Sequence, residues 1–422
     1  MKYTVFILFI GLLVAQCTSR KSTDPETEFR LVETPVGEKS GQPQLFTDSM
    51  DRLWLSWVEP LESGGHQLLY SRYDGNVWTE PVEAARGEKW FVNWADLPGV
   101  KPLPDGSLIA WYLVSNSDSV YGYDIHFRVK PPSNDWGDVF MPHSDGTPTQ
   151  HGFVSVDVLD DSILSVWLDG RETVEKNTDK MNNHSHGHGE EGAMTLRAVK
   201  MSFDGTLQEK MLIDGHVCSC CPTTMVAVPG GILTAYRNRT QHEIRDIYVS
   251  KFDGTRWTEP ANVHKDDWKI TACPVNGPTL ASHGSVVSVA WYTGAADKHA
   301  VKVAFSEDEG TSFSTSILID DNKPTGRAGV VMPNERTAFV SWQGMDRNNK
   351  PALMTTTVGL SEGKSENKVA VFLPDSMPPV TPKLTMTSSH FYLAWIELHT
   401  ETGHPQVKLA EKKRTDTSHK VK

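Results

Sequence analysis

Four of the chain's five cysteines stand at the starts of two neighbouring segments. Cys218, Cys220 and Cys221 fall within "HVCSCCPTT", and Cys273 begins "CPVNGP". In an oxidising compartment the first expectation is a disulfide between Cys273 and one of the other three. With His216 two residues upstream, the same thiols would suit Cu(I) or Zn(II), so a metal site is the second interpretation. A bond between adjacent cysteines, or a reactive thiol, is the third.

Arginines and carboxylates occupy similar places in other segments. A guanidinium group binds an anionic ligand through paired hydrogen bonds, and a carboxyl group can give or take a proton. An ordinary salt-bridged loop is the alternative for any one of them. The candidates for ligand binding are Arg171, Arg239, Arg245, Arg327, Asn93, Trp94 and Asn276. The candidates for acid–base chemistry are Asp96, Asp246 and Glu243, and His151 stands at a comparable segment start.

A histidine-rich stretch, "NNHSHGHGEEG", lies in a polar insertion at residues 172–192. His184, His186 and His188 alternate there with small residues, and such loops can take up copper or zinc. Because the alternation sets no ligand geometry, a surface insertion without bound metal is the other interpretation.

The elements that would position these residues repeat along the chain. A turn followed by a short apolar strand with an aromatic residue near its end recurs about every 54 residues. The seven aromatic positions are Trp57, Trp111, Trp167, Tyr236, Trp291, Trp342 and Trp395. Within each repeat, alternating apolar and polar residues indicate four short antiparallel strands rather than helices.

This pattern predicts an all-β chain folded as a β-propeller of four-stranded antiparallel blades. Seven aromatic repeats favour seven blades, with six blades and an extra sheet as the alternative. The last repeat lacks an outer strand, and "FRLVETPVG", which begins at Phe29, has no blade of its own. We therefore expect the N-terminal strand to complete the last blade, so that one domain spans residues 29–415.

Turns between the third and fourth strands carry a second motif. "SEDEGTSF" (Ser306 to Phe313) has the Ser-x-Asp-x-Gly-x-Thr-aromatic form of an Asp box, except for one serine in place of threonine. "SRYDGNVW" and "SKFDGTRW" are close variants, and "SFDGTL" is a weaker one. The chain thus resembles the sialidase superfamily with its bacterial neuraminidase repeats. That resemblance implies a propeller whose Asp boxes are structural turns, and a sugar site at the central rim.

Sialidases hold the sugar carboxylate with three arginines and use a Tyr–Glu nucleophile pair with an acidic Asp. The first arginine usually lies in an Arg-Ile/Leu-Pro motif near the start of the propeller. The nearest match here is Arg30 in "FRLVETP", which lacks the following proline. The arginine motif is therefore not found, which separates the expected fold from sialidase chemistry.

The first residues predict where the protein is located. Lys2, an apolar run from Val5 to Ala15 and then Cys17 resemble a bacterial lipoprotein signal, with residues 1–16 removed and Cys17 lipidated. Plain secretion is the alternative, and Gln16 departs from the usual small residue. Residues 17–28 are expected to be a tether and 416–422 a disordered tail. The expected location is the cell envelope, with the membrane reached only through the lipid.

The net charge of −12 is spread along the chain, which argues against nucleic acid as a partner. Two functions remain, and we favour the first: a sialidase-like exported propeller, expected to be a monomer, that binds or hydrolyses a carbohydrate or another small anionic ligand. The alternative is a metal-binding or redox propeller that uses the four cysteines. A scaffold for protein partners, without catalysis, is the third interpretation.

Overall fold

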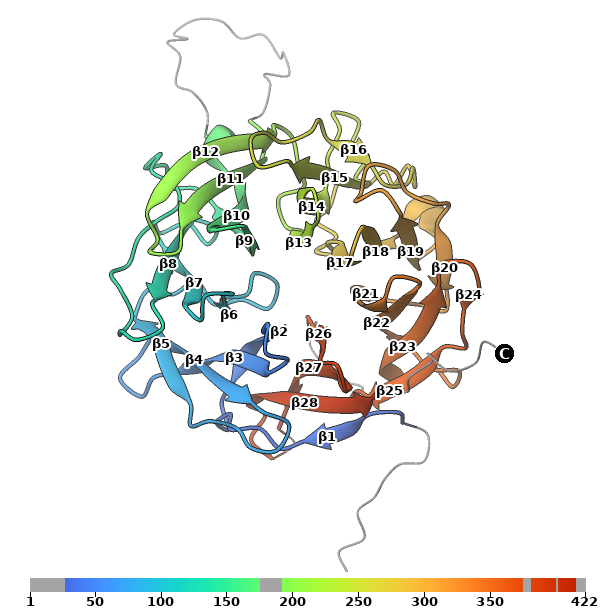
Figure 1. Ribbon diagram of the computed structural model, residues 1–422, viewed down its shortest axis with the longest axis horizontal. Coiled ribbons are helices and arrows are strands. Elements are labelled where there is room, and N and C mark those ends of the chain that lie inside the picture. The colour runs from blue at the N-terminus through green and yellow to red at the C-terminus, as the bar shows by residue number, and fades with distance from the viewer. Residues whose placement is uncertain (1–26, 175–191, 375–380, 400, 415–422) are drawn as a thin grey trace, which may run out of the picture.

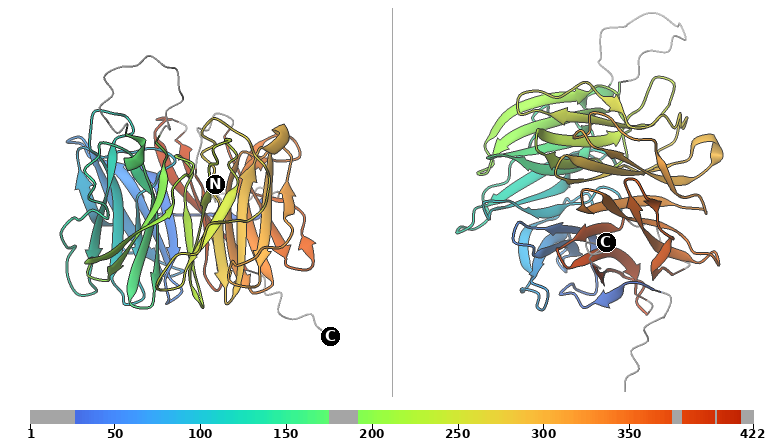
Figure 2. Two further views of the ribbon diagram at one scale, coloured as in Figure 1. Left: turned by 90° about the horizontal axis from the view of Figure 1, so that it is seen from above. Right: turned by 45° about the vertical axis from the view of Figure 1, so that its right-hand side comes forward.

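The computed structural model describes residues 27–174, 192–374, 381–399 and 401–414. Its sheets form a closed ring around a central axis (Figure 1). Figure 2 shows the strands running across the thickness of this ring. The architecture is an all-β propeller of seven blades, as the aromatic repeat predicts.

The first three blades occupy residues 41–214. Blade 1 contains β2 (Gly41–Thr47), β3 (Leu53–Pro60), β4 (His66–Tyr73) and β5 (Val82–Gly87). Blade 2 contains β6 (Gly99–Pro102), β7 (Leu108–Ser115) and β8 (Tyr123–Lys130). Blade 3 contains β9 (His151–Leu159), β10 (Ser162–Asp169), β11 (Thr195–Ser202) and β12 (Leu207–Asp214), with the short helix η1 (Arg171–Thr173) after β10.

The next three blades follow the same order from the axis outward. Blade 4 contains β13 (Thr224–Val228), β14 (Gly231–Arg237), β15 (Ile247–Phe252) and β16 (Ala261–Asn262). Blade 5 contains β17 (Thr279–His283), β18 (Val286–Thr293), β19 (Ala300–Ser306) and β20 (Ile317–Asp320), with η2 (Ala295–Asp297) after β18. Blade 6 contains β21 (Gly326–Asn334), β22 (Thr337–Met345), β23 (Pro351–Gly359), β24 (Gly363–Lys364) and β25 (Lys368–Phe372).

Blade 7 closes the ring with strands from both ends of the chain. It contains β26 (Lys383–Met386), β27 (His390–Leu398), β28 (Pro405–Lys413) and β1 (Arg30–Val32). β1 pairs with β28 in antiparallel register, Leu31 opposite Ala410, and Arg30 forms an ion pair with Glu411. The prediction that the N-terminal strand completes the last blade is confirmed.

Not every blade has the expected four strands. The described sheet of blade 2 has three, and Phe140 contributes only an isolated bridge to Phe127 where an outer strand would lie. In blade 6, β24 and β25 both pair with β23, so its sheet has five strands. Strand number therefore varies at the outer edge, while the three inner strands of every blade are kept.

The repeated aromatic residues all lie on the second strand of their blades and are buried. Their polar atoms are paired: Trp342 donates its indole N–H to Asp320 at 2.6 Å, and Tyr236 donates its hydroxyl to Asp214 at 2.7 Å. Five of the six indoles donate to carboxylates, and Trp111 instead donates to the Leu97 carbonyl. Each large side chain can thus fill the space between blades without an unpaired N–H.

The Asp-containing turns also have the expected local role. Asp308, between β19 and β20, accepts the Ser312 N–H at 2.8 Å and the Ser306 hydroxyl at 2.7 Å. Gly310 has φ +87°, a conformation that glycine adopts without strain, and Phe313 packs against the core shared by blades 4 and 5. These contacts stabilise the turn.

Several predictions concern residues that the structure does not describe. The signal peptide, Cys17 and most of the tether precede residue 27, and His184, His186 and His188 fall within residues 175–191. The tail beyond residue 414 is also outside the described ranges. Among the residues that are described, no helix has the length and apolar character needed to cross a membrane.

We predict that Trp342→Phe destabilises the propeller by about 1–3 kcal/mol, because the buried Oδ2 of Asp320 loses its donor. Urea unfolding followed by far-ultraviolet circular dichroism measures this. Trp78→Phe is the matched control, since the Trp78 indole N–H bonds the Glu33 carbonyl at an exposed place. Equal, small effects of the two substitutions would contradict the role given to the buried pair.

Candidate functional site

The starts of the seven inner strands gather at one face of the ring, here called the rim. Non-glycine residues with positive φ occur at four of these starts: Gln42 (φ 53°), Phe153 (56°), Val275 (49°) and Arg327 (56°). Three of the four strands, β2, β9 and β21, have an irregular register with their neighbours at this point. Such conformations are unfavourable for non-glycine residues and concentrate at functional sites. The rim therefore has the strained backbone that is typical of functional sites.

The loop before β6 carries three of the predicted residues. Asn93 accepts the N–H groups of Ala95 at 2.7 Å and Asp96 at 2.8 Å, which holds the loop in a tight turn. Gln42 of blade 1 donates to the Asn93 carbonyl. Asn93 therefore positions Asp96 and is itself occupied by backbone contacts.

Asp96 is buried between blades 2 and 3. Tyr123 donates its hydroxyl to Oδ2 at 3.0 Å, and the Phe153 N–H donates to Oδ1 at 2.8 Å. Burial raises the pKa of Asp96 to about 7, although both hydrogen bonds and the charge of Lys383 act in the opposite direction. A carboxyl group with this pKa holds a proton at slightly acidic pH and can release it near neutrality.

Asp96 lines a cavity of about 180 Å³ at the inner strands. Burial lowers the pKa of Lys383, another lining residue, to about 8. Lys101 also lines the cavity and donates to Asp157 at 2.9 Å. The remaining walls mix apolar and polar groups, among them Gln44, Phe46, Trp111, Ser155, Thr223 and Thr224. Five blades contribute to this cavity, so only the closed ring assembles it.

Trp94 and Arg327 meet although they belong to different blades. The Arg327 guanidinium lies 4.7 Å from the centre of the Trp94 ring, and Thr381 donates to the Trp94 carbonyl at 3.0 Å. Burial lowers the pKa of Arg327 to about 10, so it remains a cation at neutral pH. Asn276 accepts the Arg327 N–H at 2.8 Å, so these three predicted residues lie together at the rim.

The other predicted arginines are matched to carboxylates. Arg239 and Arg245 both bind Glu243, at 2.5 Å and 2.8 Å, and these contacts lower the pKa of Glu243 to about 2. Arg171 binds Asp169 at 2.6 Å. Their charges are therefore compensated locally, and the described contacts do not converge on one ligand.

Asp246 holds the backbone of a neighbouring loop in place. Its two oxygens accept the N–H groups of Asp267 and Trp268, both at 3.1 Å. Burial raises its pKa, but its side chain organises the loop after β16. Proton transfer by Asp246 or by Glu243 stays an untested prediction.

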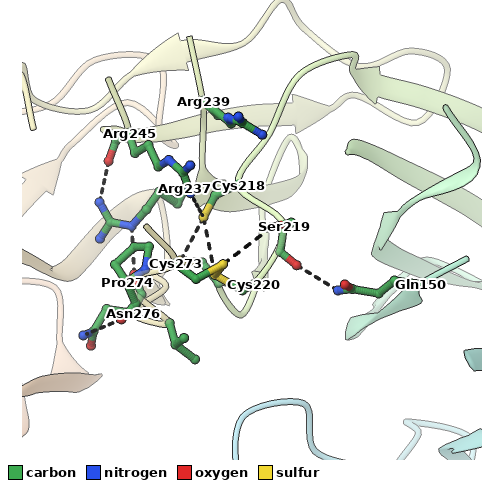
Figure 3. Close-up of a disulfide and its surroundings, with 12 residues drawn as sticks. Gln150, Cys218, Ser219, Cys220, Arg237, Arg239, Arg245, Cys273, Pro274 and Asn276 are labelled. Atoms are coloured by element: carbon green, nitrogen blue, oxygen red, sulfur yellow. Dashed lines mark hydrogen bonds between the residues drawn. A yellow bond between two sulfur atoms is a disulfide. The ribbon is translucent and has the colours of Figure 1, made fainter. Parts of the chain in front are cut away.

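The cysteines lie between blades 4 and 5 (Figure 3). Cys220 and Cys273 form a disulfide with a Cα–Cα distance of 6.0 Å, which confirms the expected link between these blades. Cys218 and Cys221 are free and buried. The Sγ atoms of Cys218, Cys220 and Cys221 lie within 4.8 Å of one another. The His216 ring does not belong to this group of potential metal ligands.

A second polar cluster joins blades 2 and 3, and sequence reasoning found only two of its members. His151, noted for its place in the repeat, lies 3.1 Å from Asp124 and 3.3 Å from Asp145. Arg171 contacts Asp145 at 3.0 Å, and the His143 ring stacks on His151 with centroids 3.9 Å apart. The missed residues are scattered through loops and strands, and no local motif marks them.

The His151 cluster is suited to holding a charged imidazole. Burial alone would lower the pKa of His151, but its contact with the accepting Asp124 carboxylate and the charges of Asp169 and Asp145 raise it above its ordinary value. Burial lowers the pKa of His143 to about 4, and its Nε2 accepts the Ile125 N–H at 3.2 Å. The two stacked rings therefore differ in proton affinity, because the pKa of His143 is lowered and that of His151 is raised.

Comparisons with known proteins identify the fold. No protein-family profile and no curated protein match the sequence. Among solved structures, the BP39L lectin from Burkholderia pseudomallei has a TM-score of 0.60 and 9% identity, covering 88% of this chain and 96% of that one. The phage phi92 endosialidase has a TM-score of 0.50 and 8% identity, covering 94% and 70%. NanB sialidase from Streptococcus pneumoniae has a TM-score of 0.46 and 12% identity, covering 92% and 70%. At these identities the likeness to the lectin and the endosialidase shows the propeller fold.

We predict that His151→Gln lowers stability by about 3 kcal/mol at pH 6, because it removes a buried cation from three carboxylates of which Arg171 contacts only two. The raised pKa means that the contribution of His151 is complete below its unfolded pKa and is lost as the pH rises through its folded pKa. Urea unfolding at pH 6 and pH 9 should therefore show a smaller loss at pH 9. His283→Gln, at an exposed position, is the control, and an equal loss at both pH values would contradict the charged cluster.

Proposed function

We propose that this protein binds a glycan, or another small anionic ligand, in the rim cavity, and that Asp96 transfers the proton if the ligand is hydrolysed. The observation that carries the proposal is the position of Asp96, which lines the cavity with a pKa raised to about 7. A general acid works best when its pKa lies near the working pH. Tyr123, hydrogen-bonded to Asp96, is the neighbouring group that orients it.

The cavity lining supports a sugar-sized ligand. Sugars present apolar faces and hydroxyl groups together, and Phe46 and Trp111 supply apolar walls while Gln44 and Lys383 supply hydrogen-bonding groups. Two structures of similar fold are a lectin and an endosialidase, so this fold can carry glycan sites in other proteins. The cationic groups Lys383 and Arg327 favour a ligand with an anionic substituent.

A sialidase-type clamp of three arginines is not part of the proposal. Arg239 and Arg245 share Glu243, and Arg171 is held by Asp169, so recruiting them would leave those carboxylates unpaired. Any anionic group would instead meet Lys383 in the cavity or Arg327 at the rim. The substrate is therefore proposed as a class, a glycan, without commitment to sialic acid.

We predict that Asp96→Asn lowers kcat by about 100-fold or more, because the amide keeps the shape and one accepting oxygen but cannot supply the proton. Fluorogenic glycosides, including a sialoside, measure hydrolysis, and a glycan array measures binding. Asp161→Asn, in the exposed turn at the far end of β9, should leave both unchanged. In the wild type, kcat/KM should fall as the pH rises above about 7. If the wild type neither binds nor hydrolyses any glycan on either panel, the proposal fails.

We also propose that the protein is anchored in the cell envelope through a lipid on Cys17. The support is the sequence alone: an apolar run from Val5 to Ala15 that ends just before this cysteine. Expression of the full chain in a bacterium fed labelled palmitate should give a labelled protein in the membrane fraction. Cys17→Ser should lose the label. Label retained in that variant, or wild-type protein released without label, would contradict the anchor.

A further inference from the structure

Two buried thiols lie side by side at the start of blade 4. Cys218 and Cys221 have the Cys-x-x-Cys spacing, and their Sγ atoms are 3.3 Å apart. Their exposed fractions are 0% and 1%, so neither thiol meets solvent directly. A buried pair of cysteines can be purely structural. The groups around this pair decide whether its thiols are reactive.

The nearest group with which these thiols can react is a disulfide. The Cys218 Sγ lies 3.9 Å from the Cys220 Sγ, which is bonded to Cys273. Cys220 is partly exposed and Cys273 is exposed. Figure 3 shows the sulfur atoms converging, with Cys273 reaching across from the segment before blade 5. The buried pair of thiols therefore lies beside a disulfide that is itself exposed to solvent.

The two buried thiols differ in acidity. The hydrogen bond from Cys221 lowers the pKa of the Cys218 thiol to about 6, with help from the Cys220 N–H and from Arg237 and Arg245, against the effect of burial. The Arg245 Nη1 atom lies 3.4 Å from the Cys218 Sγ. Burial raises the pKa of Cys221 well above its ordinary value. One cysteine is thus a thiolate nucleophile and the other a proton-holding partner.

The cationic surroundings are fixed in place. Arg237 is buried and donates to the carbonyls of Asn276, Arg245 and Tyr292 at 2.9, 2.6 and 2.7 Å. Its charge therefore stays beside Cys218. Permanent guanidinium charges stabilise thiolates and oppose the entry of a metal cation, and the disulfide leaves only two sulfurs as free thiols. These surroundings favour thiol chemistry over a metal centre.

We propose that the four cysteines form a dithiol–disulfide relay that passes electron pairs between the buried thiols and an external disulfide. The exposed Cys220–Cys273 bond is the point of contact with the partner. This inference is independent of the glycan proposal, because it concerns other residues and another reaction. The partner is a disulfide-bearing protein, for which a small disulfide serves as a probe.

The relay begins with an exchange that needs no outside oxidant. The Cys218 thiolate attacks the Cys220 Sγ, a new Cys218–Cys220 bond forms, and Cys273 leaves as a thiolate. Cys221 then attacks Cys218 while its proton passes to the leaving Cys220 thiolate, which forms the Cys218–Cys221 disulfide and releases Cys220 as a thiol. One disulfide and two thiols remain, but the thiols are now at the exposed pair.

The external step oxidises the protein by two electrons. The Cys273 thiolate attacks the partner's disulfide and one partner thiolate leaves. Cys220 then attacks the mixed disulfide at Cys273, re-forms the Cys220–Cys273 bond and releases the second partner thiolate, while solvent supplies and accepts the protons. The protein then holds two disulfides, and the partner's disulfide has become two thiols.

Trapping with N-ethylmaleimide tests the first step directly. In the native full chain the reagent should label Cys273, which is free only after Cys218 has attacked Cys220. Cys218→Ser should reduce this labelling at least tenfold, since the attacking thiolate is absent. Cys221→Ser separates the two steps: it keeps Cys218 but stops the relay after the first exchange, so Cys273 should still be labelled while no Cys218–Cys221 bond forms. Peptide mapping assigns each label and separates Cys17.

Oxidised glutathione tests the complete relay. The wild type should release two equivalents of glutathione and gain a Cys218–Cys221 bond, whereas the double variant Cys220→Ser/Cys273→Ser should form that bond at least tenfold more slowly. His283→Gln, at an exposed position of β17, should behave as the wild type, and circular dichroism confirms that each variant is folded.

Three results would overturn the relay. The first is an unlabelled Cys273 in the native wild type. The second is direct labelling of Cys218 and Cys221 with the Cys220–Cys273 bond intact. The third is stoichiometric copper or zinc on the isolated protein, with four free thiols after its removal, which would assign the cysteines to a metal centre.

Discussion

The structure depends on the closure of a ring in which each sheet buries both faces against its neighbours. A single four-stranded blade exposes an apolar face, so its stability comes from the next blade, and the last blade must find the first. Here β1 pairs with β28, and Arg30 and Glu28 form ion pairs with Glu411 and Lys412 from the other end of the chain. The buried aromatic residue of each second strand fills the space between sheets, and its paired polar atom removes the cost of an unsatisfied N–H or O–H.

Closure of the ring also sets the pKa of Asp96 and the contacts between residues at the rim. Asp96 is an ordinary carboxyl group in its loop, and its pKa rises because blades 2 and 3 exclude water around it. Trp94 and Arg327 are far apart in the sequence and meet because their blades are held around one axis. The four positive φ angles at the inner-strand starts show that the backbone here is held by the surrounding sheets rather than by local preference.

The sequence predicted the repeated part of the molecule better than its site. A buried aromatic residue recurs in each second strand because every blade faces the same packing problem, so seven blades and the closing N-terminal strand could be inferred. The Cys220–Cys273 link could also be expected, since both segments begin neighbouring blades. Outer-strand number was less regular than predicted, because the outer edge has fewer packing constraints.

The contacts that define the site come from tertiary structure and left little local signal. Tyr123 and Lys383 both affect the pKa of Asp96. The sequences of their strands do not differ visibly from those of other strands. Arginine content alone could not show that Glu243 holds Arg239 and Arg245. The His143–His151 stack likewise joins a loop to a strand start, and burial rather than spacing makes it significant.

Ring closure buries Asp96 enough to raise its pKa to about 7. Infrared difference spectroscopy of the full chain across pH 3 to 9 measures this, because a protonated carboxyl group has a C=O stretch that its carboxylate lacks. The wild type should show a protonated-carboxyl band that disappears with a midpoint near pH 7, and Asp96→Asn should lack this band. A spectrum in which the variant and the wild type lose the same bands, all below about pH 5, would contradict it.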